Sequence, residues 1–233
     1  MIHQSSTQRA TIVIVAIFSI SPITQPANSQ TKRPDHHAIS KLETIKDLIR
    51  QRNHKEALTR LNEFKDAERS TSDYHFLRGR AMQELKRNTD ALADYTISIF
   101  LDKSNVDARI NRALTRGALG DINGALKELD EAALIDPENP VISMNRGVTL
   151  AGLNRSQEAI REFDRAIRIN HKYTDAYRNR GIVRHYLKDE PGACRDWRQA
   201  SSYGDEEAYQ WVKFYCTNQS SSKAKTRPKP AGR

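Results

Sequence analysis

The chain has 233 residues, of which 37% are hydrophobic, 7% aromatic and 29% charged, with 10 glycines and 8 prolines. This composition excludes a collagen-like, mucin-like or wholly disordered chain and suits a globular protein of one or two domains. The formal net charge is +9, of which residues 217–233 carry +5 and residues 1–37 carry +2. The body of the chain, residues 38–216, is therefore nearly neutral and offers no broad electropositive face. We expect no nucleic-acid partner.

The first 29 residues have the segment order of a secretory signal. Arg9 precedes an apolar run of eleven residues, ATIVIVAIFSI at 10–20, and the small residues Ala27 and Ser29 flank Asn28 before a predicted cleavage at Gln30. At about 1.5 Å per residue this run is too short to cross a hydrocarbon core of about 30 Å. We therefore expect a cleaved signal over 1–29, a linker over 30–37 and a periplasmic or secreted protein. An uncleaved membrane anchor is the alternative.

A short sequence pattern recurs at one fixed interval along the body of the chain. Asn-Arg followed by a small residue occurs without gaps at 111–113, 145–147 and 179–181. Alanine recurs with the same period at 91, 125, 159 and 193, and four positions after each comes a large residue: Tyr95, Leu129, Phe163 and Trp197. Five units follow, at 38–71, 72–105, 106–139, 140–173 and 174–207, the first being a degenerate copy. Coincidental helical patterning does not keep a gapless register through so many copies.

Each unit is predicted to be a pair of amphipathic helices. In the unit 106–139, the first helix should run from about Ala108 to Leu119 and the second to about Ile135. Gly120 makes the turn and Asp121 caps the second helix, while Pro137 cannot extend the helical hydrogen bonds. Small residues at the fixed positions allow the two helices to approach closely.

These units resemble tetratricopeptide repeats, whose pattern places small residues at unit positions 8, 20 and 27 and a large apolar residue at position 24. Gly79, Gly147 and Gly181 match position 8. The proline of position 32 is present only as Pro137, and the aromatic residue of position 4 only as Tyr177. The resemblance covers residues 38–216 and implies an all-α fold, a right-handed solenoid of five helical hairpins, and a non-enzymatic binding scaffold without a cofactor.

The resemblance also implies that the first helices line a concave groove. Carried over position by position, the groove residues are Phe76, Arg80, Ile110, Asn111, Leu114, Met144, Asn145, Val148, Arg178, Asn179, Ile182 and His185. The floor is apolar, and its recurring asparagine both donates and accepts hydrogen bonds. We expect an extended client peptide there. The alternatives are asparagines that hydrogen-bond adjacent helices, or a groove filled by a helix of this chain or a second copy.

Two features depart from the family's best-known pattern. Some members grip a terminal carboxylate with paired lysine and asparagine, but Ile110, Met144 and Val148 stand where the lysines would be, so we do not expect that mode. Position 7 is arginine in four units: Arg78, Arg112, Arg146 and Arg180. We expect their stems to pack between helices and their guanidiniums to pair with acids on the second helices: Asp94, Asp130, Asp164 or Asp196.

A further helix over 205–216 is predicted to cap the open end of the stack. An antiparallel turn near Gly204 brings Cys194 and Cys216 to the same level, so we expect a disulfide in an oxidising compartment. Two free, buried thiols are the alternative. The chain has no C-x-x-C pair, which argues against a redox enzyme.

The last residues, 217–233, are rich in serine, lysine and proline and should be disordered. They are either a solubilising end or a weak tether to an anionic membrane or wall. No nucleotide-binding, hydrolase or metalloprotease motif occurs, and we expect no metal site. The sequence thus predicts a protein that holds a partner's peptide segment in the assembly of an envelope or membrane complex. The alternative is a self-associating structural protein tethered by its basic tail.

Overall fold

The computed structural model describes residues 36–217, and every regular element in that range is a helix, which confirms the predicted all-α class. The elements are α1 (His36–Arg50), α2 (His54–Asn62), α3 (Asp66–Arg69), α4 (Ser72–Glu84), α5 (Asn88–Leu101), α6 (Val106–Ala118), α7 (Ile122–Ile135), α8 (Pro140–Gly152), α9 (Ser156–Ile169), α10 (Thr174–Tyr186), α11 (Glu190–Ser202), α12 (Glu206–Trp211) and the π-helical turn η1 (Val212–Cys216). The predicted signal, most of the linker and the tail lie outside the described residues. Within them, no helix has the length and apolarity that a bilayer crossing requires.

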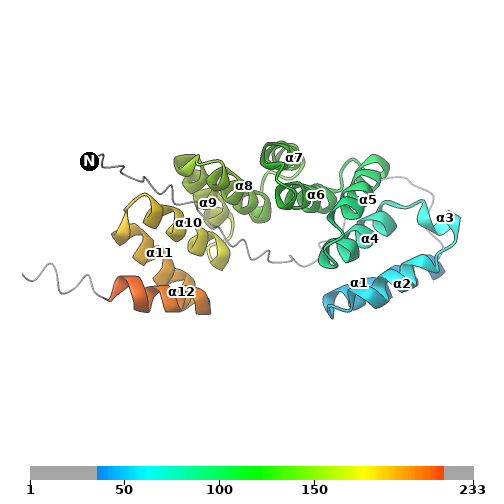
Figure 1. The fold of residues 1–233 in the computed structure, drawn as a ribbon, viewed down its shortest axis with the longest axis horizontal. Coiled ribbons are helices and arrows are strands. Elements are labelled where there is room, and N and C mark those ends of the chain that lie inside the picture. The colour runs from blue at the N-terminus through cyan, green and yellow to red at the C-terminus, as the bar shows by residue number, and fades with distance from the viewer. Residues whose placement is uncertain (1–35, 218–233) are drawn as a thin grey trace, which may run out of the picture.

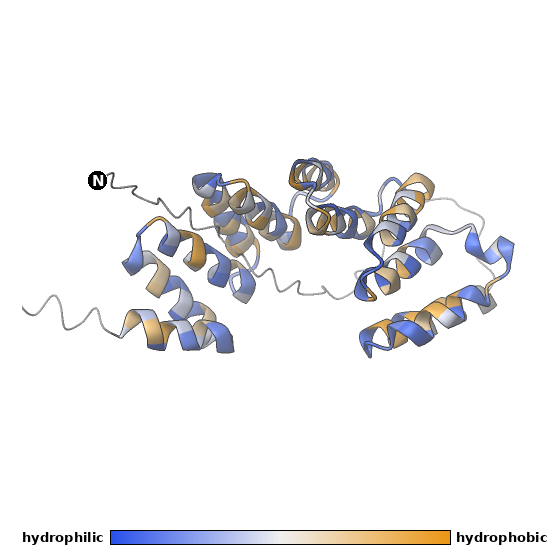
Figure 2. Cartoon of the chain, in the orientation of Figure 1, coloured by the Kyte–Doolittle hydropathy of each residue, from blue (hydrophilic) through white to orange (hydrophobic). Residues whose placement is uncertain are grey.

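The helices stack as consecutive hairpins. α4 packs on α5, α6 on α7, α8 on α9 and α10 on α11, and each second helix also contacts the first helix of the next unit. The stack forms an arch, with α4 and α6 on its inner side and α5 and α7 on its outer side (Figure 1). Polar and apolar residues alternate along each helix (Figure 2), as expected where one face is buried against a neighbour. The predicted solenoid is confirmed.

A glycine facing an aromatic ring sets the distance between the two helices in three of the hairpins. A Cβ added to these glycines would lie only 2.5 to 2.8 Å from a ring atom. The pairs are Gly79 with Tyr95, Gly147 with Phe163, and Gly181 with Trp197. In the unit 106–139 the same two positions hold Ala113 and Leu129, both fully buried. The larger residue on one helix is therefore matched by a smaller one on the other.

Gly147→Ala is expected to lower the free energy of unfolding by about 2 kcal/mol, because the new methyl group overlaps the buried ring of Phe163. The double variant Gly147→Ala/Phe163→Leu reproduces the pair Ala113–Leu129 and should regain most of this loss. Gly152→Ala, where a Cβ meets nothing within 4 Å, is the matched control and should be neutral or slightly stabilising. Urea unfolding of the variants measures all three. An undiminished loss in the double variant would contradict the volume match.

The hairpin turns share one backbone feature that their residue types do not predict. One residue in each turn has a left-handed backbone, and these residues recur with the period of the repeat: Arg52 (φ 59°), Lys86 (φ 64°), Gly120 (φ 90°), Asn154 (φ 60°) and Lys188 (φ 64°). Glycine adopts this region without cost and asparagine tolerates it, whereas arginine and lysine do not favour it. The packing of the two helices therefore fixes the turn. The predicted cap at Asp121 is confirmed, since its side chain accepts from the Gly124 amide at 2.9 Å.

The two ends of the stack differ from the predicted units. The first helix begins at His36, inside the predicted linker, and the second helix of the first unit, α2, ends at Asn62, so this unit is not a regular hairpin. The chain then turns so that Phe64 is buried against Tyr74, with ring centres 5.5 Å apart, before the short helix α3. At the other end, the predicted single cap helix is an α-helical segment followed by the wider turn η1.

The disulfide is present as predicted. Cys194 in α11 and Cys216 at the end of η1 are bonded, with Cα atoms 5.7 Å apart. The bond lies beside Trp197, Ala200 and Ala208, which form the core of the cap. It therefore ties the last segment of the described chain to the last full hairpin.

Candidate functional site

The predicted groove residues lie on α4, α6, α8 and α10, and each of these helices contacts the next one in the stack. Three of the apolar candidates are almost covered by their neighbours, with 5 to 7% of their surface exposed: Phe76, Ile110 and Met144. The part of the apolar floor that solvent reaches is made by three half-buried side chains: Leu114, Val148 and Ile182. These three stand at unit position 9, one in each of three successive units, and so form a row along the arch.

The recurring asparagines are bonded within their own helices. Each side-chain amide donates at 2.8 to 2.9 Å to the carbonyl four residues earlier: Asn111 to Asp107, Asn145 to Val141, and Asn179 to Asp175. The predicted alternative, a bond to an adjacent helix, is therefore wrong for these donors. Their side-chain oxygens accept no hydrogen bond from the described residues and are not among the fully buried unpaired atoms there. Each asparagine thus keeps an acceptor that no described residue fills, although Asn145 and Asn179 are buried, with only 4% and 9% of their surface exposed.

Two of the predicted groove residues are engaged by the cap. Arg178 donates to Asp205 and to Asp175, each at 2.6 Å. The Nδ1 atom of His185 lies 2.8 Å from Glu190 Oε2, and its ring packs between those of Trp197 and Tyr215, at centre distances of 5.6 and 4.8 Å. Both side chains therefore position the C-terminal end of the stack and are less free to meet a ligand than the sequence suggested.

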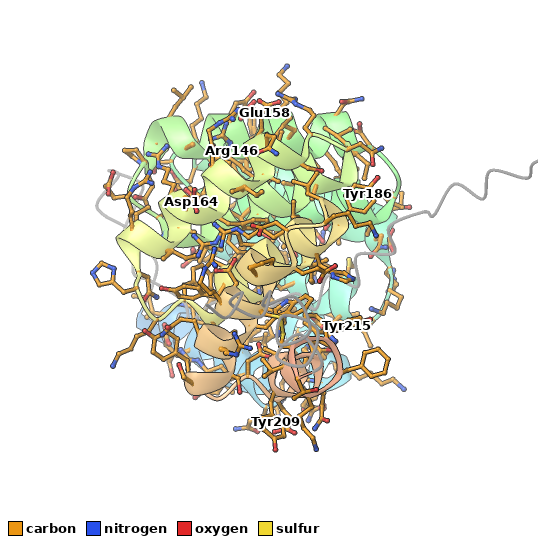
Figure 3. All side chains as sticks on the ribbon, turned by 90° about the vertical axis from the view of Figure 1, so that its left-hand side faces the viewer. Arg146, Glu158, Asp164, Tyr186, Tyr209 and Tyr215 are labelled. Atoms are coloured by element: carbon orange, nitrogen blue, oxygen red, sulfur yellow. A yellow bond between two sulfur atoms is a disulfide. The ribbon has the colours of Figure 1, made fainter. Side chains whose placement is uncertain are left out.

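The arginine ladder is an ion-pair network, as predicted. Each arginine reaches an acid at the same sequence separation, on the second helix of its own unit, at 2.6 to 2.9 Å: Arg78 to Asp94, Arg112 to Glu128, Arg146 to Glu162, and Arg180 to Asp196. Arg146 and Arg180 also reach back by that separation to Asp130 and Asp164 of the preceding unit. Arg146 and Asp164 are labelled in Figure 3, which views the stack from its C-terminal end. The hydrogen bond to Asp94 raises the pKa of Arg78.

The ladder joins the two helices of each hairpin, and through Arg146 and Arg180 it also joins neighbouring hairpins. Glu128 and Glu162 are partners that the sequence prediction, which named aspartates alone, did not include. Searching at the constant separation between Arg78 and Asp94 for any acid, glutamate included, would have found both partners. Carboxylates hold most of the ladder's guanidinium groups, although Arg112 Nε and Glu162 Oε2 are buried without a hydrogen-bond partner.

A further exposed surface lies at the C-terminal end. Figure 3 views the end of the stack, where Tyr186, Tyr209 and Tyr215 are 39 to 46% exposed. A shallow open hollow there is lined by Gln210, Trp211, Lys213, Phe214 and Tyr215. Among residues 39–217, no three or more His, Cys, Asp or Glu side chains gather as metal ligands would.

Comparison with known proteins places the fold. The tetratricopeptide repeat family model matches residues 110–174. Among solved structures, PilF of Pseudomonas aeruginosa matches with a TM-score of 0.69 at 14% identity, and the match covers 80% of this chain and 87% of the PilF chain. TTC0263, a thermophilic tetratricopeptide repeat protein of Thermus thermophilus, has a TM-score of 0.66 at 14% identity, covering 76% and 96%. MamA of Desulfovibrio magneticus RS-1 has a TM-score of 0.62 at 15% identity, covering 72% and 96%. No curated protein matches the sequence.

Proposed function

Because this chain is a tetratricopeptide repeat protein with the fold of a protein-interaction scaffold, we propose that it binds an extended segment of a partner protein along the inner side of the arch and performs no chemistry itself. The observation that carries this proposal is the row of half-buried Leu114, Val148 and Ile182 beside asparagines whose side-chain oxygens accept no hydrogen bond from the described residues. Apolar side chains of a client would cover the row, and its backbone amides would donate to the asparagines.

The place of action in this proposal is outside the cytoplasm, in the assembly of an envelope or membrane complex. The signal-like segment 1–29 supports export. The bond between Cys194 and Cys216 supports it independently, because such bonds persist in oxidising compartments.

The test is site-specific photo-cross-linking in the native envelope. A photoreactive phenylalanine analogue replaces Val148 on the inner side, and in the control it replaces Leu134, which is 86% exposed on α7. The proposal expects covalent adducts with one or a few partner proteins from position 148, and mass spectrometry of the adducts should locate a single linear segment. Adducts from position 134 alone, or cross-linked peptides scattered over the partner's fold, would refute the inner-side site.

A second candidate function, self-association with the basic tail as a tether, is favoured by an exposed apolar ridge on the outer side. The ridge consists of Ile97, Phe100, Leu101, Leu134 and Ile135, of which Phe100 is 79% and Leu134 86% exposed. Light scattering across a range of protein concentrations tests this self-association.

A protein that stays monomeric at every concentration would remove this candidate. A dimer that falls apart in the double variant Phe100→Ser/Leu134→Ser would support it. Vesicle binding that salt does not weaken would exclude the electrostatic tether.

A further inference from the structure

Arg80, in α4, differs from the other arginines of the described chain. With 8% of its surface exposed, it is buried, and no described residue forms an ion pair or hydrogen bond with its guanidinium, whereas the similarly covered Arg109, Arg112, Arg178 and Arg180 all hold carboxylates. The ladder arginines Arg78 and Arg112, by contrast, each hold a carboxylate at 2.7 Å. A buried charge without a partner costs stability, so its presence on the inner side calls for a counterion.

The side chain is held with its donors open. The guanidinium carbon lies 5.8 Å from the centre of the Phe76 ring, and that ring packs in turn on Tyr95, with centres 6.2 Å apart. None of the Arg80 nitrogens is among the fully buried unpaired atoms of the described residues, so they still meet solvent while the stem is covered. A planar guanidinium beside an aromatic ring is suited to grip a carboxylate through two parallel hydrogen bonds.

The nearby charges leave this guanidinium incompletely compensated. Burial lowers the pKa of Arg80, and Arg50 lowers it further, while Tyr95, Asp107 and Glu84 oppose the shift through space. Neither Asp107 nor Glu84 forms an ion pair with Arg80. Burial also raises the pKa of Asp107, which Arg80 opposes. An arriving carboxylate would therefore meet an unfilled donor set, at some cost from the negative charge of Asp107.

Arg80 stands at the same unit position as the apolar row. It precedes Leu114, Val148 and Ile182 by one, two and three repeat units. Packed helices lie about 8 to 10 Å apart, and a chain in the polyproline II conformation advances about 3.1 Å per residue and returns to the same face every three residues. Successive first helices should thus be met by client side chains about three residues apart on one face of the client.

The geometry points to Arg80 as the receptor for an acidic side chain of the client, followed at steps of about three residues by apolar side chains on Leu114 and Val148. This inference rests on the proposed function and specifies its client: an extended segment with a carboxylate at one end of an apolar row. Asp107→Asn removes a competing charge and should strengthen the binding of such a segment.

The test uses the full chain, labelled with ¹⁵N, and capped heptapeptides followed by NMR shifts. The probe is the capped peptide Glu-Ser-Gly-Leu-Ser-Gly-Leu. It is compared with a capped peptide in which Gln replaces Glu, and with a third peptide that has this Gln sequence and a free C-terminal carboxylate. The Glu peptide should bind about tenfold more tightly than the capped Gln peptide, as a charge-assisted hydrogen bond supplies. Preference for the free terminus instead would overturn the assignment to an acidic side chain.

The variants isolate the residue. Arg80→Met should erase the preference for Glu without weakening the Gln peptide, and it should raise the melting temperature, since an uncompensated charge is removed. Arg80→Lys should keep part of the preference, because the charge stays and the fork is lost. The control Arg87→Met, which removes a 51% exposed side chain preceding α5, should keep all of it. An equal preference in Arg80→Met, or no binding of either peptide to the natural chain, would overturn the inference.

The cross-linking experiment separates this inference from the proposed function. Failure of adducts at position 148 would remove the inner-side site altogether. Persistent adducts at 148 in the Arg80→Met variant, at full yield and with the same client, would leave the scaffold function standing and remove only the acidic subsite.

Discussion

Replacing Arg78 with methionine is expected to lower the free energy of unfolding by about 3 kcal/mol, because it leaves a buried carboxylate without its main partner. Asp94 is 2% exposed. It forms an ion pair with Arg78 at 2.7 Å, and His75 Nδ1 lies 2.9 Å from its Oδ1 atom. Both groups attach α4 to α5, so the loss should appear in the cooperative unfolding of the N-terminal hairpins. Urea unfolding, followed by circular dichroism, measures it.

The control for this prediction is Arg87→Met, which removes an exposed pair with Asp90 and should cost less than about 1 kcal/mol. Arg146→Leu should fall between them, since its partner Asp130 is 52% exposed while Glu162 is 17% exposed. The double variant Arg78→Met/Asp94→Leu removes both charges and should recover much of the stability. If Arg78→Met were as mild as Arg87→Met, the ladder would not be a stabilising network.

Loss of the disulfide is expected to cost about 3 kcal/mol, the chain-entropy value for a loop of this length. The bonded residues are 22 apart, and the loop contains α12 and most of η1. These segments cover Trp197, which is 2% exposed and packs on Trp211 with ring centres 5.4 Å apart. Opening the bond should therefore loosen the cap first, and tryptophan fluorescence should report the change before helix content falls.

Cys194→Ala/Cys216→Ala is the variant for this measurement, and reduction of the natural chain by dithiothreitol is the independent comparison. The two treatments should agree in midpoint and in the early change of fluorescence. If dithiothreitol still lowered the stability of the double alanine variant, its effect on the natural chain would not arise from breaking this bond. An unchanged stability in both cases would mean that packing of the aromatic residues alone holds the cap.

The candidate site was only partly visible in the sequence. Asn111, Asn145 and Asn179 were placed on the inner helices by their period, but the period does not reveal that each amide is bonded to its own helix. The isolation of Arg80 was equally hidden. Whether an arginine has an ion-pair partner depends on the acidic side chains that neighbouring helices, such as α5 and α6, place beside it. The repeat period of the sequence does not show this.

The sequence by itself determined the 34-residue register of the central hairpins and the pairing of small residues with large ones, and it favoured the bond between the two cysteines. These follow from local rules, because a hairpin repeated in a stack meets the same neighbours each time. Only the tertiary structure decided the ends, where one neighbour is missing: Phe64 turned into the core and the cap widened to a π-helical turn. It also imposed the left-handed turn at Lys86 and Lys188, since helix packing there outweighs the backbone preference of lysine.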